Sequence, residues 1–231
     1  MLEFRNLRLT QGDFTLTADF QVPKGARVAV IGASGAGKST LLSLIGGFEA
    51  SDDGDILWQG KPFGRSAPFE RPISHLFQDN TLFAHMTAAQ NVGLGLKPNL
   101  RLSKSDKDTV SEALRAVGLE GLEARRPGAL SGGQQSRVAL ARVLVQRKPL
   151  ILLDEPFSAL GPAMRHEMID MAKEVSARLE ATMLMVTHDV SDVDHFADLV
   201  IWVEEGLCHP PRPWTEMMSE PPKGLLDYIG T

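Results

Sequence analysis

The sequence contains a glycine-rich loop with one lysine near its end, Gly32-Ala33-Ser34-Gly35-Ala36-Gly37-Lys38-Ser39-Thr40. It matches the pattern G-x-x-x-x-G-K-[ST], in which glycines let backbone amides curl around a phosphate without Cβ clashes. A short apolar run precedes this phosphate loop at residues 27–31, and an apolar helix is expected after it at residues 40–45. A strand, a glycine-rich loop and a helix in this order predict an α/β nucleotide-binding fold.

Two residues of the phosphate loop have expected chemical roles. Lys38 can reach the β- and γ-phosphates of a nucleotide as a point charge, and the Ser39 hydroxyl can ligate Mg²⁺. The alternative is a glycine-rich turn with an incidental lysine. It is disfavoured because the strand, the loop and the helix agree with one another.

An apolar run at residues 150–153 ends in two carboxylates, Asp154 and Glu155. This pattern suits a central parallel strand, whose carboxyl end is where α/β sheets bind ligands. We expect Asp154 to hold Mg²⁺ through water and Glu155 to take a proton from an attacking water. An ordinary acidic turn would explain the pair equally well in isolation, but the phosphate loop favours the catalytic interpretation.

Two more polar residues follow predicted strands. Gln78 ends the candidate strand at residues 72–77, where it could orient a water or touch Mg²⁺, although alone it would more often be a polar loop residue. His188 follows the candidate strand at residues 181–186. A lone histidine is usually structural, but this one belongs to the third polar cluster at a strand end, which favours a phosphate contact.

A second candidate anion site is the Ser131 segment, which reads Leu130-Ser131-Gly132-Gly133-Gln134. Its glycines open a helix predicted over residues 134–146, where backbone N–H groups face outward and Ser131 adds a hydroxyl donor. That helix runs ~23 Å, whereas the strand carrying Asp154 returns only ~15 Å toward the phosphate loop. We therefore expect the Ser131 segment to serve the nucleotide of another subunit.

The rest of the chain indicates strands at the N-terminus and helices in the middle. Residues 2–30 have the alternation of half-buried strands, and residues 80–130 hold helical pieces such as residues 103–117. A helix is predicted over residues 162–179, with its methionines in the core. Five prolines between residues 210 and 222 predict an irregular tail, with an amphipathic piece near residues 225–229.

Composition excludes some classes of protein. The net charge of −5 argues against a nucleic-acid partner. The single cysteine, Cys208, cannot form an internal disulfide and fits a reducing compartment. The N-terminal residues do not resemble a signal peptide, and no apolar run approaches the ~20 residues that cross a bilayer.

The phosphate loop, Gln78, the Ser131 segment, the two carboxylates and His188 together resemble, in order and spacing, an ABC-type ATPase subunit. The resemblance covers almost the whole chain. It implies ATP and Mg²⁺ as cofactors and a head-to-tail homodimer, in which each ATP lies between one subunit's phosphate loop and the other's Ser131 segment. It also implies one ABC ATPase domain over residues 1–231: a RecA-like core with a β subdomain (1–79 and 147–210), a helical subdomain (80–146) and a C-terminal tail (211–231).

Residues 78–87 and 90–96 resemble bacterial thiamine importer ATPases more closely. That resemblance implies integral membrane permease subunits as partners, indirectly a periplasmic solute-binding protein, no nucleic acid, and a peripheral place on the cytoplasmic face of the bacterial inner membrane. The loop after Gln78 would receive a cytoplasmic helix of the permease. Open alternatives are another cargo (iron, a polyamine, sulfate or a sugar), a soluble ABC protein of DNA repair or translation, and a small phosphate-loop kinase.

Three positions depart from the ABC pattern. Gln11 stands where an aromatic residue usually stacks on adenine, and Phe14 is the nearest aromatic residue. Gly161 replaces an aspartate, and Ser136 replaces a common glutamine. None of these departures removes an expected catalytic group.

Overall fold

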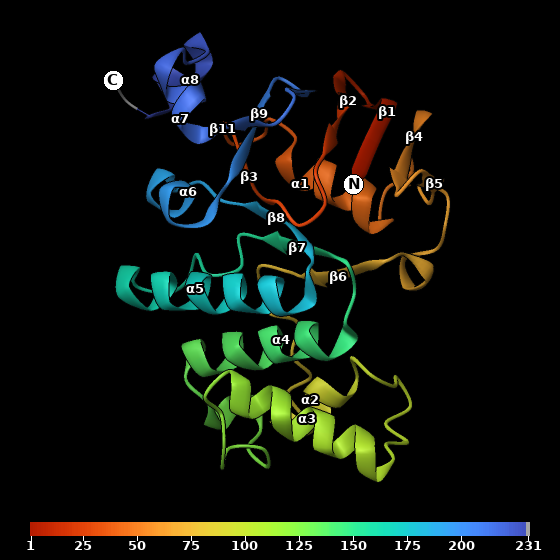
Figure 1. The fold of residues 1–231 in the computed structure, drawn as a ribbon, viewed down its shortest axis with the longest axis vertical. Coiled ribbons are helices and arrows are strands. Elements are labelled where there is room, and N and C mark those ends of the chain that lie inside the picture. Colours follow the sequence, from red (N-terminus) through yellow and green to blue (C-terminus); the bar gives the residue numbers. More distant parts are fainter. Residues whose placement is uncertain (230–231) are drawn as a thin grey trace.

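A computed structural model describes residues 1–229 of the chain (Figure 1). One sheet runs through the molecule in the order β5-β4-β1-β2-β10-β9-β3-β8-β7-β6, and β11 pairs with β9. The strands are β1 (Leu2–Gln11), β2 (Phe14–Val22), β3 (Arg27–Ile31), β4 (Asp53–Trp58), β5 (Lys61–Pro62), β6 (Ile73–Leu76), β7 (Leu150–Asp154), β8 (Thr182–Val186), β9 (Leu199–Glu204), β10 (Leu207–Cys208) and β11 (Arg212–Pro213).

Helices lie on both faces of the sheet and in a separate layer beyond it (Figure 1). Short 3-10 helices span Pro68–Glu70 and Pro127–Ala129. The α-helices are α1 (Lys38–Gly46), α2 (Ala88–Gly93), α3 (Lys104–Ala116), α4 (Gly132–Gln146), α5 (Pro162–Leu179), α6 (Val190–Phe196), α7 (Trp214–Ser219) and α8 (Lys223–Ile229).

The sheet changes character along its width. Strands β6, β7, β8, β3 and β9 are parallel, whereas β1 pairs antiparallel with β2 and with β4. The parallel part is a buried central sheet, as its continuous apolar strands predict. The structure therefore confirms the expected α/β fold, with a parallel core, antiparallel N-terminal strands and a helical insert.

Alternation in β3 divides the apolar interior into two cores. Val28 and Val30 face the core shared with α1 and the N-terminal strands, while Ala29 and Ile31 face the core shared with α4, α5 and α6. All four side chains are fully buried. Because the phosphate loop leaves the end of this strand, its backbone starts from a point fixed by packing on both sides.

The helical insert consists of α2, α3 and α4, which pack on one another away from the sheet (Figure 1). Helix α4 also packs on α5 and β6, and so joins the insert to the core. Helix α3 begins with a capping box between Ser103 and Asp106, which satisfies two backbone N–H groups at its first turn. Helix α4 therefore connects the insert to the parallel part of the sheet.

The prediction that the methionines of α5 lie in the core is wrong for one of them. Met168 is fully buried, but Met164 is 43% exposed. Met164 lies in the first turn of α5, where its sulfur packs against the backbone of Gly133 in α4. The apolar side chains of α5 thus leave the core at the N-terminal end of this helix, which approaches the Ser131 segment.

The prediction of an irregular tail is also wrong, because α7 forms inside the proline-rich stretch. Pro213 precedes its first residue and Pro221 follows its end, so the prolines bound this helix without interrupting it. Met217 of α7 and Leu225 of α8 are buried, which anchors both helices on the core.

Strand β10 carries the single cysteine. Cys208 is 2% exposed, and burial raises the pKa of its thiol to about 12. Over residues 1–229, no helix combines the length and the apolar character that crossing a bilayer requires.

Candidate nucleotide-binding and catalytic site

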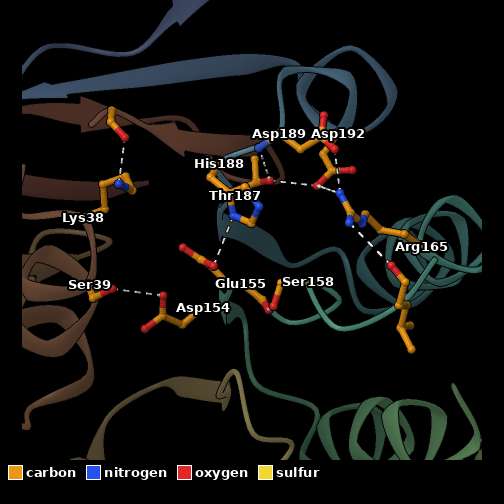
Figure 2. A network of polar contacts seen from close by, with 12 residues as sticks. Lys38, Ser39, Asp154, Glu155, Ser158, Arg165, Thr187, His188, Asp189 and Asp192 are labelled. Carbon is orange, nitrogen blue, oxygen red and sulfur yellow. Dashed lines mark hydrogen bonds and ion pairs between the residues drawn. The ribbon is translucent and has the colours of Figure 1, made fainter. Parts of the chain in front are cut away.

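The carboxyl ends of the parallel strands bring Asp154, Glu155 and His188 to one edge of the sheet (Figure 2). Asp154 pairs with Val186 across β7 and β8, and the Glu155 amide donates to the Val186 carbonyl at 3.1 Å. Gln78 lies two residues beyond β6, which runs parallel to β7. It is exposed and makes no side-chain hydrogen bond within the described residues.

Lys38 is held inside the phosphate loop. Its ammonium group donates to the carbonyls of Gly32 at 2.8 Å and Ala33 at 2.9 Å, and the residue is 9% exposed. Burial lowers the pKa of Lys38, while the nearby carboxylates of Glu155 and Asp154 oppose that shift. The lysine is therefore a desolvated cation, and the attraction between it and an anion is stronger than it would be in water.

Two glycines of the loop are required by close packing at positive φ. Gly37 has φ 112°, and a Cβ there would lie 2.8 Å from the ring of Phe14. Gly32 has φ 155°, and a Cβ there would clash with the carbonyl oxygen of Val203. Both positions therefore exclude side chains, which leaves the backbone amides of the loop free to approach a phosphate.

Ser39 and Asp154 present oxygen ligands to the same point. The Ser39 hydroxyl donates to the Asp154 carboxylate at 3.3 Å, and burial raises the pKa of that carboxyl. A half-buried carboxylate beside a hydroxyl suits a hard cation such as Mg²⁺. No group of three His, Cys, Asp or Glu side chains within residues 1–229 is placed to hold a metal. A hard cation held by Ser39 and Asp154 would take further oxygen ligands, such as water, phosphate oxygens or the amide oxygen of Gln78.

Glu155 and His188 face each other across the edge of the sheet (Figure 2). The imidazole Nδ1 lies 3.2 Å from the Glu155 carboxylate, and the His188 side chain is 56% exposed. Glu155 has φ 43°, a left-handed conformation that is costly for a residue other than glycine. The Ser158 hydroxyl donates to its carbonyl at 3.1 Å and helps to hold it. Such strain is common where a side chain must be aimed at a reacting atom.

The sequence did not reveal the polar residues that hold the segment around His188. The Thr187 hydroxyl donates to Asp192 at 2.7 Å, and Arg165 pairs with Asp189 at 2.6 Å. The Tyr228 hydroxyl donates to the His188 backbone carbonyl at 2.8 Å. These contacts join α5, α6 and α8, which are separated in the chain. The only sequence signal was Asp189, whose side chain caps α6.

A cavity of about 340 Å³ opens beside the phosphate loop. It is lined by residues 34, 35 and 37–40 of the loop and by Gln11, Phe14 and Glu155. Gln11 and Phe14 are paired across the β1–β2 hairpin. The amide side chain of Gln11 and the ring of Phe14 therefore stand together at the mouth of the phosphate-binding cavity.

The Ser131 segment starts α4 with a capping box. The Gln134 amide donates to the Ser131 hydroxyl oxygen at 3.3 Å, and the Ser131 amide donates to the Gln134 side chain at 3.0 Å. Gly132 is exposed, whereas Gly133 lies under Met164. None of residues 131–134 is among the described residues that line the cavity beside the phosphate loop. Their service to another subunit remains a prediction.

Helix α4 is tied to the loop that follows Gln78. Arg142 donates to the carbonyls of Asn80 at 2.8 Å and Thr81 at 3.0 Å, and the Asn80 side chain donates to the Ser136 hydroxyl at 3.2 Å. The small Ser136 side chain thus has a partner of its own. Movement of this loop would be transmitted to the helix that carries the Ser131 segment.

A lysine-bearing phosphate loop, a Ser–Asp pair for a divalent cation and a strained glutamate at the next strand end define a nucleotide hydrolase of the phosphate-loop class. The model of one protein family, described as ABC transporter, matches residues 16–158. The chain therefore belongs to the ABC transporter family.

Individual relatives agree. The chain is 50% identical to the thiamine import ATP-binding protein ThiQ of Cereibacter sphaeroides over 230 residues, which cover 100% of both chains. A solved ATP-binding cassette of an ABC transporter in its ADP conformation has a TM-score of 0.89 at 26% identity, covering 100% of this chain and 99% of that one. A dimeric cassette in a post-hydrolysis state with ADP and Pi has a TM-score of 0.78 at 27% identity, covering 92% and 98%.

Proposed function

We propose that this chain is the ATP-hydrolysing subunit of a bacterial thiamine importer. The observation that carries the proposal is the 50% identity, over the full length of both chains, to a protein named for thiamine import. The site supplies the chemistry that such a subunit needs. Its cofactors are then ATP and Mg²⁺, in keeping with a solved relative that is bound to ADP and Pi.

The residues divide the work of hydrolysis. Lys38 and the phosphate-loop amides bind the β- and γ-phosphates, and Ser39 with Asp154 holds the cation, which when bound neutralises charge on the phosphate oxygens. Glu155 accepts a proton from the attacking water. His188, 3.2 Å from that carboxylate, contacts the γ-phosphate, and Gln78 orients the water from the neighbouring strand end.

The Ser131 segment acts on the ATP of a second copy of the chain. A related cassette has been solved as a dimer, and none of residues 131–134 lines the described cavity of its own phosphate loop. In a head-to-tail homodimer, the partner's Ser131 hydroxyl and first-turn amides approach the γ-phosphate, an arrangement favoured at a helix N-terminus. Gly132, Gly133 and Gln134 belong to the same contact.

The importer assignment places the chain on the cytoplasmic face of the inner membrane, beside permease subunits that receive solute from a periplasmic binding protein. Exposed aromatic side chains lie near the loop after Gln78: Phe48 is 54% exposed and packs edge-on against Phe77, and Phe83 is 48% exposed. We propose that this apolar surface receives a permease helix. We keep the domain limits proposed above, with a core at residues 1–79 and 147–210, the helical subdomain at 80–146 and the tail at 211–231.

Uptake of labelled thiamine tests the assignment. A strain that lacks this gene and any second thiamine route receives the wild type, Glu155→Gln or the control Glu174→Gln, whose residue is exposed on α5. We expect the wild type and Glu174→Gln to restore uptake, and Glu155→Gln to fail. Equal uptake with and without the wild-type gene would reject thiamine as the cargo, and iron, polyamine, sulfate and sugar uptake would then be measured.

A further inference from the structure

The C-terminal helix α8 lies beside the catalytic edge of the sheet. Leu225 is fully buried in the core, and the Tyr228 ring meets Trp202 of β9 edge-on, with ring centroids 5.7 Å apart. Gly224 allows this approach, because a Cβ there would lie on the carboxylate of Glu204. Backbone and side-chain contacts thus dock α8 in one position on β9.

Docked in this way, α8 places one hydroxyl group on the segment that carries His188. The Tyr228 hydroxyl donates to the His188 backbone carbonyl at 2.8 Å, although the two residues are 40 positions apart. Burial raises the pKa of Tyr228, and the carboxylates of Glu155 and Asp189 act in the same direction. The hydroxyl therefore keeps its proton and remains a donor at neutral pH.

The His188 segment is also held by α5 and α6. Thr187 and Asp189 are tied to α6 and α5 through Asp192 and Arg165, whereas the imidazole itself is 56% exposed and contacts Glu155. A donor on the carbonyl of His188 fixes the orientation of the peptide that follows it. The orientation of this peptide restricts the backbone conformation of His188. It therefore restricts the direction in which the imidazole ring points toward Glu155.

We propose that Tyr228 is a positioning residue for ATP hydrolysis, which acts by holding the His188 peptide so that the imidazole faces Glu155 and the γ-phosphate. This inference rests on the proposed function, since it assigns the C-terminal tail a part in the same reaction. Tyr228 touches neither nucleotide nor water in this role. Its effect falls on turnover and leaves nucleotide binding by the phosphate loop unchanged.

Tyr228→Phe removes the hydroxyl and keeps the ring that packs on Trp202. In the full-length chain we expect kcat for ATP hydrolysis to fall about threefold to tenfold, the value of one hydrogen bond, with KM for ATP within about twofold of the wild type. The control Asp227→Asn changes an exposed neighbour on the same helix and leaves kcat unchanged. Thermal melting of each variant verifies that the fold is intact.

A double-mutant cycle with His188→Ala separates positioning from a general structural effect. If Tyr228 acts through the imidazole, Tyr228→Phe lowers single-turnover hydrolysis in the wild-type background and changes it by less than about twofold in the His188→Ala background. Equal losses in both backgrounds would overturn the inference. So would an unchanged kcat for Tyr228→Phe, while the proposed function would stand. Absence of hydrolysis by the wild-type transporter would instead refute the proposed function, and this inference with it.

Discussion

The phosphate loop and the Ser131 segment both place backbone amides at a helix N-terminus, yet their surroundings differ. Around the phosphate loop, α1 supplies Lys38 and Ser39, and the end of β7 supplies Asp154 and the following Glu155. Ser39 contacts Asp154, while Lys38, Ser39 and Glu155 line one cavity. Around the Ser131 segment, the described side-chain hydrogen bonds are those of its capping box and those that Gln135 and Ser136 donate to the carbonyls of Leu130 and Gly132.

This difference teaches how one chain divides a reaction. The phosphate loop has the proposed cation ligands and the proposed general base beside it, so the groups proposed for hydrolysis lie together there. The Ser131 segment offers an exposed helix terminus without catalytic side chains of its own. A helix N-terminus stabilises a nearby anion. In the proposed dimer, that anion is the γ-phosphate of the ATP bound by the partner.

Glu155→Gln should have the largest effect on the site beside the phosphate loop. Removing the general base should lower kcat by about a hundredfold or more, while ATP binding stays within about twofold because the phosphate loop is unchanged. Steady-state hydrolysis and binding of a fluorescent ATP analogue measure the two effects, with Glu174→Gln as control. Normal turnover by Glu155→Gln would remove Glu155 from the role of base.

Mixing two inactive variants sharpens the comparison. Lys38→Ala disables a phosphate loop, and Ser131→Arg obstructs an exposed helix terminus. A head-to-tail dimer can contain one copy of each variant. One of its two sites then combines the intact phosphate loop of the Ser131→Arg copy with the intact Ser131 segment of the Lys38→Ala copy. Hydrolysis by the mixture should therefore exceed that of either variant alone by about tenfold, given the scale of loss expected for each phosphate contact. If each segment served its own loop, the mixture would stay inactive.

His75 lies on β6, the strand that leads to Gln78. Both ring nitrogens are buried and have no hydrogen-bond partner among residues 1–229. The ring stacks on Phe77, and burial lowers the pKa of His75 to about 4. As pH falls from about 6.5 to about 4, the unfolded chain takes up this proton before the folded chain does. The free energy of unfolding should therefore fall through this window, by about 3 kcal/mol from this group.

Urea unfolding of the wild type and of His75→Phe at pH 7 and pH 4.5 measures that contribution. The variant keeps an aromatic ring against Phe77 and should lose less stability on acidification than the wild type. His85→Phe, at an exposed position, serves as control. An identical loss of stability in wild type and His75→Phe would contradict the prediction. It would show that the folded and the unfolded chain take up this proton at the same pH.

The smallest expected effect concerns Gly161, which precedes α5 without a side-chain cap. Its φ of −66° suits any residue, and a Cβ there would meet nothing within 4 Å. Gly161→Asp should cap the helix and raise the free energy of unfolding by a few tenths of a kcal/mol, about the difference between glycine and aspartate caps. Chemical denaturation measures this gain. A loss of stability would show that the aspartate does not reach the first-turn amides.

Most of the fold was predictable because its elements carry local signals. The phosphate-loop pattern predicts the strand before it and the helix after it. The apolar run that ends in Asp154 and Glu155 predicts a central strand. Helix α3 lies within the helical piece predicted over residues 103–117, and α4 covers the predicted residues 134–146. In each case a few neighbouring residues contain the physical cause of the structure.

The missed features depend on contacts between distant segments. Helical periodicity marked Met164 as apolar, but only the approach of α4 places it on Gly133. Prolines suggested an irregular tail, yet α7 fits between them and docks through Met217. Tyr228 meets His188 across 40 residues, and no local pattern predicts that meeting.

Cys208 makes the chain well suited to spectroscopic labelling. It is the only cysteine in the sequence, it is 2% exposed, and burial raises its thiol pKa to about 12, so it offers almost no thiolate to a maleimide at neutral pH. A new cysteine at an exposed position would then be the sole reactive site without removal of the native one. Spin or fluorophore pairs introduced in this way on α4 could follow the approach of two subunits during a turnover cycle.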